Sequence, residues 1–135
     1  MKYRVLPKEE LLKLEKEFID FLVINGITAD DWVKIQKEDL SQADLIIEQF
    51  SDVVWEGSLR KAEYLTKVEA EKSYYFKCNK ATIELILVNS LSGRTTLKQA
   101  SKKYRKAREE ELFEMLDQGC VLDDGASYNK LVTEL

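Results

Sequence analysis

The amino-acid sequence predicts an α+β domain in which helices come first, a small antiparallel sheet follows, and two more helices end the chain. Two observations support this prediction. Through the first 57 residues, apolar side chains recur every three or four positions, as on one face of a helix. Aromatic and β-branched residues then fill two short segments, as in paired strands. With 135 residues, 44% of them hydrophobic and 34% charged, the chain has the size and composition of a single domain covering residues 1–135.

The first predicted helix covers residues 8–25. It begins after Pro7, and acidic residues follow in the first turn, where they suit the positive end of the helix dipole. Gly26 is a typical helix terminator because glycine adopts the left-handed conformation without strain. The broad apolar face must pack against another element, and its main residues are Leu11, Leu14, Phe18, Phe21 and Leu22.

Two more helices are predicted over residues 28–37 and 42–57. Thr28 is expected to cap the first, with Asp31 as the acid of a capping box. Ser41 is expected to cap the second, with Asp44 in the same role. The second helix has the clearest apolar stripe in the chain, formed by Ala43, Ile46, Ile47, Phe50, Val53 and Val54.

Residues 72–78 and 82–88 predict two strands, joined by a tight turn at Asn79 and Lys80. Two strands alone are only marginally stable in water. Residues 59–66 fit either a helix or a strand. Because a third strand would stabilise the other two, we assign these residues to a strand, which completes a three-stranded antiparallel meander covered by the helices.

Residues 90–94 form the most linker-like stretch of the chain. A long helix is predicted after it over residues 96–118, with Gly119 as its terminator. Residues 123–125 predict a turn, and Ser127 is expected to cap a short C-terminal helix.

Composition argues against several classes of function. The chain has no histidine, which removes the commonest general base and metal ligand. Cys78 and Cys120 show no paired spacing, and we expect both to be reduced core residues. We predict no catalytic, cofactor or metal site, because no group of acids has a metal-selecting spacing. The start of the chain lacks a signal sequence and no apolar run could span a membrane, so we predict a cytoplasmic protein.

The chain resembles an uncharacterised family of small proteins from Bacteroidota. The resemblance covers most of the chain and rests on residues 1–4, 17–27, 50–54, 59–61, 63–65, 76–78 and 119–120. These segments are typical of a shared fold and include no catalytic signature. The resemblance implies a bacterial cytoplasmic setting and assigns no activity and no functional residues.

The sharpest anomaly is a block of basic residues followed by a block of acids. Residues 96–108 carry six basic and no acidic side chains, while residues 109–124 carry seven acidic and no basic ones. Within one helix this order opposes the dipole, so we expect the charges to serve another purpose. The block is either a binding surface or a solvated helix face that pairs with acids. Its candidate interaction residues are Lys98, Lys102, Lys103, Arg105 and Lys106.

Arg108 and Glu111 both lie near the middle of the apolar arc of this predicted helix, and we expect them to form a half-buried ion pair.

Two aromatic residues complete the candidate interaction set. Trp55 lies off the apolar stripe of its helix, and either Tyr74 or Tyr75 must leave the core unless helices cover both faces of the sheet; we name Trp55 and Tyr75.

The sequence therefore leaves the specific function unknown. It favours a non-enzymatic domain that binds a protein partner or a second copy of itself. The alternative is a nucleic-acid-associated protein that uses residues 98–108, although the net charge of −4 weakens that interpretation. We predict no interaction with a membrane.

Overall fold

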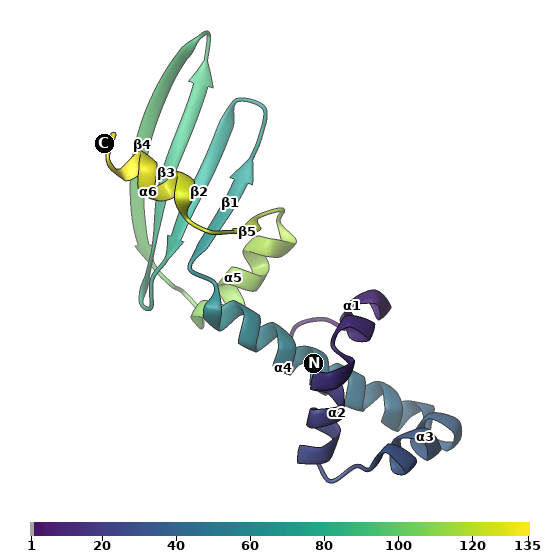
Figure 1. The fold of residues 1–135 in the computed structure, drawn as a ribbon. Helices are drawn as coiled ribbons and strands as arrows, with labels where there is room; N and C mark the ends of the chain where they lie inside the picture. The colour runs from purple at the N-terminus through teal and green to yellow at the C-terminus, as the bar shows by residue number, and fades with distance from the viewer. Residues whose placement is uncertain (1) are drawn as a thin grey trace. The chain divides into compact units, whose positions relative to one another are not determined.

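The computed structural model describes residues 2–135 and contains an α+β fold (Figure 1). Within these residues there are six helices and five strands, so the predicted class is confirmed and the predicted three-stranded sheet is too small. The contacts divide the chain into two compact units, residues 1–57 and residues 58–135.

The first unit is helical. It contains α1 (Lys8–Lys13), α2 (Glu15–Ile24), α3 (Ala29–Glu38) and most of α4 (Leu40–Lys61). The predicted helix over residues 8–25 is wrong in one respect, because it is interrupted at Leu14. The backbone there has φ −104° and ψ 25°, outside the helical range, which separates α1 from α2. Gly26 has φ +73° and follows the end of α2 as predicted.

Capping determines where α3 and α4 begin. The Oγ1 of Thr28 accepts the N–H of Asp31 at 3.0 Å and the Asp31 carboxylate accepts the N–H of Thr28 at 3.1 Å, which confirms the predicted capping box. The predicted cap at Ser41 is wrong. Asp39 caps α4 instead, since its Oδ1 accepts the N–H of Gln42 at 3.1 Å. A carboxylate at this place also interacts favourably with the helix dipole, so α4 begins earlier than predicted.

An aromatic cluster joins α2, α3 and α4 within the first unit. The ring centroid of Phe18 lies 5.1 Å from that of Trp32 and 5.0 Å from that of Phe50, both edge to face. Ala43, Ile46 and Phe50 are almost fully buried, as the stripe predicted for α4 requires, whereas Val53 of the same predicted stripe is 57% exposed.

The second unit is built on a five-stranded antiparallel sheet in the order β4-β3-β2-β1-β5. The strands are β1 (Tyr64–Val68), β2 (Lys72–Cys78), β3 (Thr82–Leu91), β4 (Arg94–Lys103) and β5 (Val121–Asp123). The strand predicted over residues 59–66 is misplaced, because α4 continues to Lys61 and β1 begins only at Tyr64. The helix continues because Leu59 and Ala62 are buried there.

The predicted long helix over residues 96–118 is the largest error. Residues 94–103 form β4, which pairs with β3 along its whole length from Arg94 to Lys103. Ser92 and Gly93 both have positive φ angles, 54° and 74°, as in the two-residue turns that match the twist of a hairpin. The segment predicted as a linker is therefore a hairpin turn, and pairing with β3 overrides the helix propensity of the lysines and alanine in β4.

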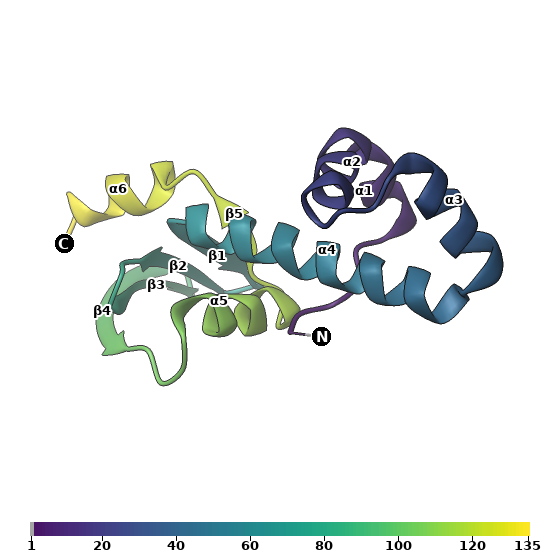
Figure 2. The ribbon, with the colours of Figure 1, turned by 90° about the horizontal axis from the view of Figure 1, so that it is seen from below.

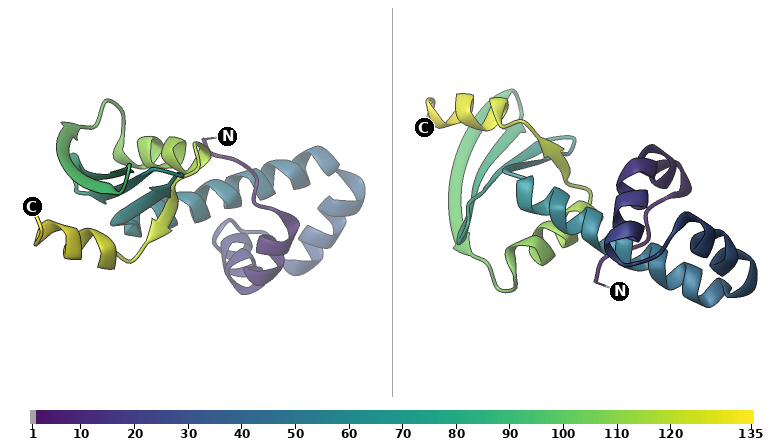
Figure 3. Two further views of the ribbon diagram at one scale, coloured as in Figure 1. Left: turned by 90° about the horizontal axis from the view of Figure 1, so that it is seen from above. Right: turned by 60° about the horizontal axis from the view of Figure 1, so that its bottom comes forward.

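Two helices cover opposite faces of the sheet (Figures 2 and 3). We call these the α5 face and the α6 face. The helix α5 (Arg108–Asp117) contributes Leu112, which is fully buried like Leu65 of β1. The helix α6 (Ala126–Val132) contributes Tyr128, whose ring centroid lies 5.8 Å from that of Tyr64. Because α5 begins only at Arg108, most of the basic block lies outside the helix and the acids Glu109, Glu110 and Glu111 lie in its first turn. This charge order suits the helix dipole, in contrast to the order expected for a helix over residues 96–118.

Gly125 makes the connection from β5 to α6. It has φ +86° and is the N-cap residue of α6, so the predicted cap at Ser127 is wrong. The carboxylate of Asp124 accepts the N–H of Ala126 at 2.9 Å and supplies the local hydrogen bond. A Cβ atom at position 125 would overlap the ring of Tyr64, so both the backbone angle and the packing require glycine.

Replacing Gly125 with alanine is therefore expected to destabilise the protein by at least about 2 kcal/mol, because the new methyl group would be strained and would displace Tyr64. Gly57, inside α4, is the matched control. A Cβ atom there meets nothing within 4 Å, and Gly57→Ala should stabilise by roughly 0.5–1 kcal/mol through helix propensity. Urea unfolding measures both changes, and equal midpoints for the two variants would contradict this assignment.

Candidate interaction site

The basic block lies mainly on β4, which forms one edge of the sheet. Nine of the ten residues of β4 are exposed, and only Leu97 is partly covered. Because side chains alternate along a strand, the register with β3 places Lys98 and Lys102 on the α5 face and Lys103 on the α6 face. The block is thus an open strand edge with positive charge on both faces of the sheet.

A row of side chains crosses the sheet beside Lys98. The register aligns Lys98 with Leu87, Leu87 with Tyr74, and Tyr74 with Lys67 of β1. Phe76 lies two residues along β2 on the same face, and its ring lies nearly parallel to that of Tyr74, with a centroid distance of 6.4 Å. Both rings are only half-buried, so this part of the α5 face combines aromatic surface with lysines.

A groove runs between α5 and this face, and we call it the α5 groove. It consists of two hollows of about 340 Å³ and 370 Å³. Both hollows are lined by Ile83, Lys102, Met115 and Gln118. One continues over Tyr74 and Phe76, and the other continues past Arg105 and Lys106. The groove therefore combines apolar side chains with a rim of charged side chains of both signs.

The five basic candidates divide into two groups. The Nζ of Lys102 lies 3.2 Å from Glu111, and Lys106 forms an ion pair with Glu114, as the alternative of internal pairing predicts. Lys98, Lys103 and Arg105 form no ion pair with any residue between 2 and 135. These three are exposed, and their charges are the ones that remain available for a partner.

Neither of the two aromatic candidates lines the groove. The Nε1 of Trp55 donates to the carbonyl of Arg4 at 3.1 Å, and the Arg4 guanidinium lies 5.0 Å from the ring centroid. Tyr75 is on the α6 face, aligned with Thr66 and Ile86, so Tyr74 and Tyr75 point to opposite faces as expected. Sequence analysis missed Phe76 and Lys67, although alternation along β2 already places Phe76 on the face of Tyr74.

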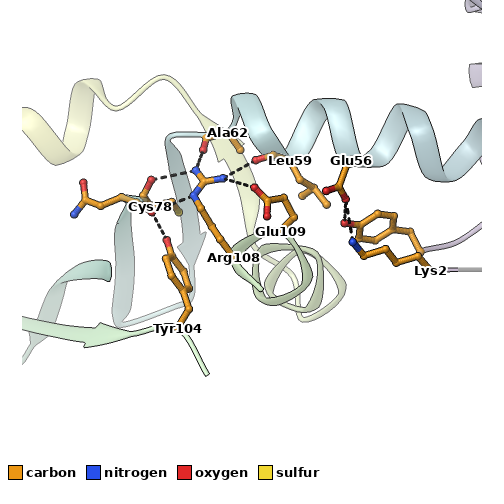
Figure 4. A network of polar contacts seen from close by, with 10 residues as sticks. Lys2, Glu56, Leu59, Ala62, Cys78, Tyr104, Arg108 and Glu109 are labelled. Carbon is orange, nitrogen blue, oxygen red and sulfur yellow. Dashed lines mark hydrogen bonds and ion pairs between the residues drawn. The ribbon is translucent and has the colours of Figure 1, made fainter. Parts of the chain in front are cut away.

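Arg108 is the most extensively bonded side chain near the site (Figure 4). Its Nη1 donates to the carbonyl of Leu59 at 2.9 Å, its Nη2 to that of Cys78 at 3.1 Å, and its Nε to that of Asn79 at 3.0 Å. The Nη2 also donates to the carbonyl of Ala62. One guanidinium thus joins the end of α4, the end of β2 and the turn after β2.

The predicted ion pair between Arg108 and Glu111 is wrong. Arg108 is 3.6 Å from Glu109 and otherwise bonds to backbone carbonyls. The Glu111 carboxylate instead accepts from the Nζ of Lys102 at 3.2 Å and the N–H of Lys106 at 3.3 Å. Burial raises the pKa of Glu111, but these two bonds and the charge of Lys102 outweigh it and hold the pKa below its usual value.

Neither cysteine is suited to nucleophilic chemistry. Burial raises the pKa of the Cys78 thiol to about 12, and burial also raises the pKa of the Cys120 thiol. Both are free thiols in the interior of the second unit and remain protonated at neutral pH.

Two acids of α4 bind the first residues of the chain that the structure describes. The Asp52 carboxylate accepts the N–H groups of Lys2 and Tyr3, each at 2.8 Å, and Glu56 lies 3.4 Å from the Nζ of Lys2 (Figure 4). Among residues 2–135, no three histidine, cysteine, aspartate or glutamate side chains are grouped so that they could hold a metal ion. None of the described helices has the length and apolar character needed to cross a membrane.

Comparison with protein families shows which family the chain matches. A family model described as "Family of unknown function (DUF6495)" matches residues 1–97 and residues 89–135, which together span the chain. The resemblance to an uncharacterised family, inferred from the sequence, is thus confirmed. Comparison with curated proteins and with solved structures gave no match.

Replacing Arg108 with alanine is expected to destabilise the protein by at least about 2 kcal/mol, because the carbonyl groups that it binds would lose their donors in a largely buried place. Arg105→Ala is the matched control. Its side chain is exposed, and we expect a change within about 0.5 kcal/mol. Chemical unfolding of the two variants measures the difference, and similar losses would contradict the role given to Arg108.

Acid is expected to weaken the contribution of Glu111. Its folded-state pKa lies below the ordinary 4.5, so the unfolded chain takes up the proton first as the pH falls. The stabilisation is complete above this value and is lost as the pH drops below it. Glu111→Gln should therefore differ more from the native chain in unfolding free energy at pH 7 than at pH 4. Gln49→Ala, at an exposed position of α4 that carries no charge, should show no such change.

Proposed function

Because the chain belongs to DUF6495, a family whose description assigns no activity, we propose from the site itself that the protein is a non-enzymatic domain that binds another protein. The contact surface is the outer edge of β4 together with the α5 groove. The observation that carries this proposal is the open edge, where nine of ten residues are exposed and three basic side chains at or next to the edge have no acidic partner among residues 2–135.

The groove fits a protein ligand better than a small substrate. Its floor is formed by Phe76, Ile83 and Met115, and burial raises the pKa of the thiol of Cys120, the cysteine in its lining. An apolar floor with a charged rim is the usual anatomy of a protein interface. The absence of histidine from the chain supports the non-enzymatic assignment.

A second exposed surface also favours a protein partner. On α2, the aliphatic side chains of Ile19, Val23 and Ile24 are 51%, 66% and 83% exposed. Clustered exposed aliphatic residues indicate protein contacts more than nucleic-acid contacts, which are mainly polar and basic.

Nucleic-acid binding is the alternative function, and one observation favours it. Tyr74 and Phe76 expose parallel rings on the face of the sheet that carries Lys98, with Leu87 between Tyr74 and Lys98, as in surfaces that stack single-stranded bases. Three acids weaken this alternative because they lie in the lining of the groove and repel phosphate; they are Glu69, Glu111 and Glu114.

The cellular setting is also part of the proposal. Cys78 and Cys120 are free and buried, as is usual for proteins of a reducing compartment, and we infer a cytoplasmic location.

Photo-cross-linking in cells tests the proposed function. With benzoylphenylalanine at Tyr74 or Lys98, irradiation should give a discrete adduct that protease removes and nuclease does not. The same residue at Lys80, in the exposed turn between β2 and β3, is the control and should give none. A nuclease-sensitive adduct would favour the alternative, and equal adducts at all three positions would refute a specific surface.

A further inference from the structure

The outer edge of β4 is the most prominent unused bonding surface of the sheet. In an edge strand, about half of the backbone N–H and C=O groups point away from the neighbouring strand and have no partner in the sheet. β4 offers such an edge over ten residues, whereas the opposite edge is β5, with only three. The ten residues of β4 are enough to pair with an added strand of ordinary length.

We propose that β4 binds an extended acidic segment of a partner protein, which adds a sixth strand to the sheet. This inference rests on the proposed function and specifies the chemistry of the partner. The main-chain hydrogen bonds would provide affinity that does not depend on sequence, and the side chains beside β4 would select the partner.

The charge of β4 argues for an acidic partner. The strand carries Arg94, Lys98, Lys102 and Lys103 and no acidic residue. Lysines on an edge strand deter unselective pairing with other strands. An acidic strand is the one class of partner for which the same charges become attractive.

The same charges argue against a second copy of the chain at this edge. Antiparallel pairing of two β4 strands would bring basic residues together, for example Lys98 of one copy opposite Lys102 of the other. Like charges directly opposite each other destabilise a sheet. Self-association through β4 is therefore disfavoured.

The side-chain pattern defines the partner further. On the α5 face, Lys98 and Lys102 flank the small Ala100, so the added strand should carry acids four residues apart on that face. On the α6 face, the added strand lies beside Leu97, the least exposed residue of β4, which favours an apolar neighbour there. Lys102 already pairs with Glu111, so Lys98 is the stronger contact for the partner.

A set of ten-residue peptides tests the inference by fluorescence anisotropy with the full chain. The probe alternates glutamate and threonine, which forms a strand with acids on one face. A glutamate–proline peptide keeps the charge but loses the N–H donor at every second residue and favours a polyproline conformation, and a lysine–threonine peptide reverses the charge. We expect the first peptide to bind and both others to bind at least about tenfold more weakly.

Two charge-reversal variants complete the test. Lys98→Glu with Lys103→Glu should weaken binding of the acidic peptide by about tenfold or more. Lys80→Glu with Lys130→Glu changes the net charge equally at exposed positions outside β4 and should leave binding unchanged. Thermal unfolding of both double variants checks that they fold, and hydrogen exchange should show β4 amides newly protected by the peptide.

Three results would overturn the inference. Equal binding of the glutamate–proline peptide would show attraction by charge alone. Tighter binding of a ten-nucleotide oligothymidylate would assign the edge to nucleic acid. Failure of the acidic peptide to bind, with a protein cross-linked at Lys98, would leave the proposed function in place and refute strand addition.

Discussion

The fold of the second unit depends on the hydrogen bonds that Arg108 donates to backbone carbonyls. Where α4 ends and β2 gives way to a turn, several backbone carbonyls meet in a place largely closed to water. Buried carbonyls without donors are strongly destabilising. One guanidinium, 13% exposed, donates to four of them at once, and its charge also suits the negative end of α4. The hydroxyl of Tyr104 donates to the carbonyl of Asn79 at 2.9 Å and completes the arrangement.

This arrangement also positions the candidate interaction site. Tyr104 and Arg108 connect the end of β4 to the start of α5, so the same bonds that satisfy the carbonyls set the distance between α5 and the sheet. The α5 groove lies in that space, and Glu111 of α5 holds Lys102 of β4 at its centre. Lys98, in the middle of β4, and Lys103, on the face of the sheet opposite to Lys102, remain unpaired among residues 2–135 and give β4 its open positive edge.

Sequence patterns predicted the helical unit well because its structure is largely local. Three- and four-residue spacing identified the apolar stripe of α4, and Thr28 with Asp31 identified the start of α3. The same local reasoning failed at residues 94–103. Lysine, glutamine and alanine there favour a helix in isolation, and the decisive information lies in the Ser92–Gly93 turn, which pairs the segment with β3. The charge order looked unusual only because residues 96–118 were predicted as one helix; in the structure most of the basic residues lie on β4 or in the segment after it and the acids lie on α5.

Composition and periodicity record local preferences, and they were enough to predict the α+β class, the helical first half, the two central strands and the basic character of residues 96–108. The tertiary structure was needed to show that this basic segment is an edge strand, and that Lys102 and Lys106 are paired while Lys98, Lys103 and Arg105 are not. It was also needed to show that Tyr74 and Phe76, and not Tyr75, line the α5 groove. These outcomes depend on contacts between residues distant in the chain. Their energies come from sheet register and from burial of α5 and α6, which no local pattern of residues encodes.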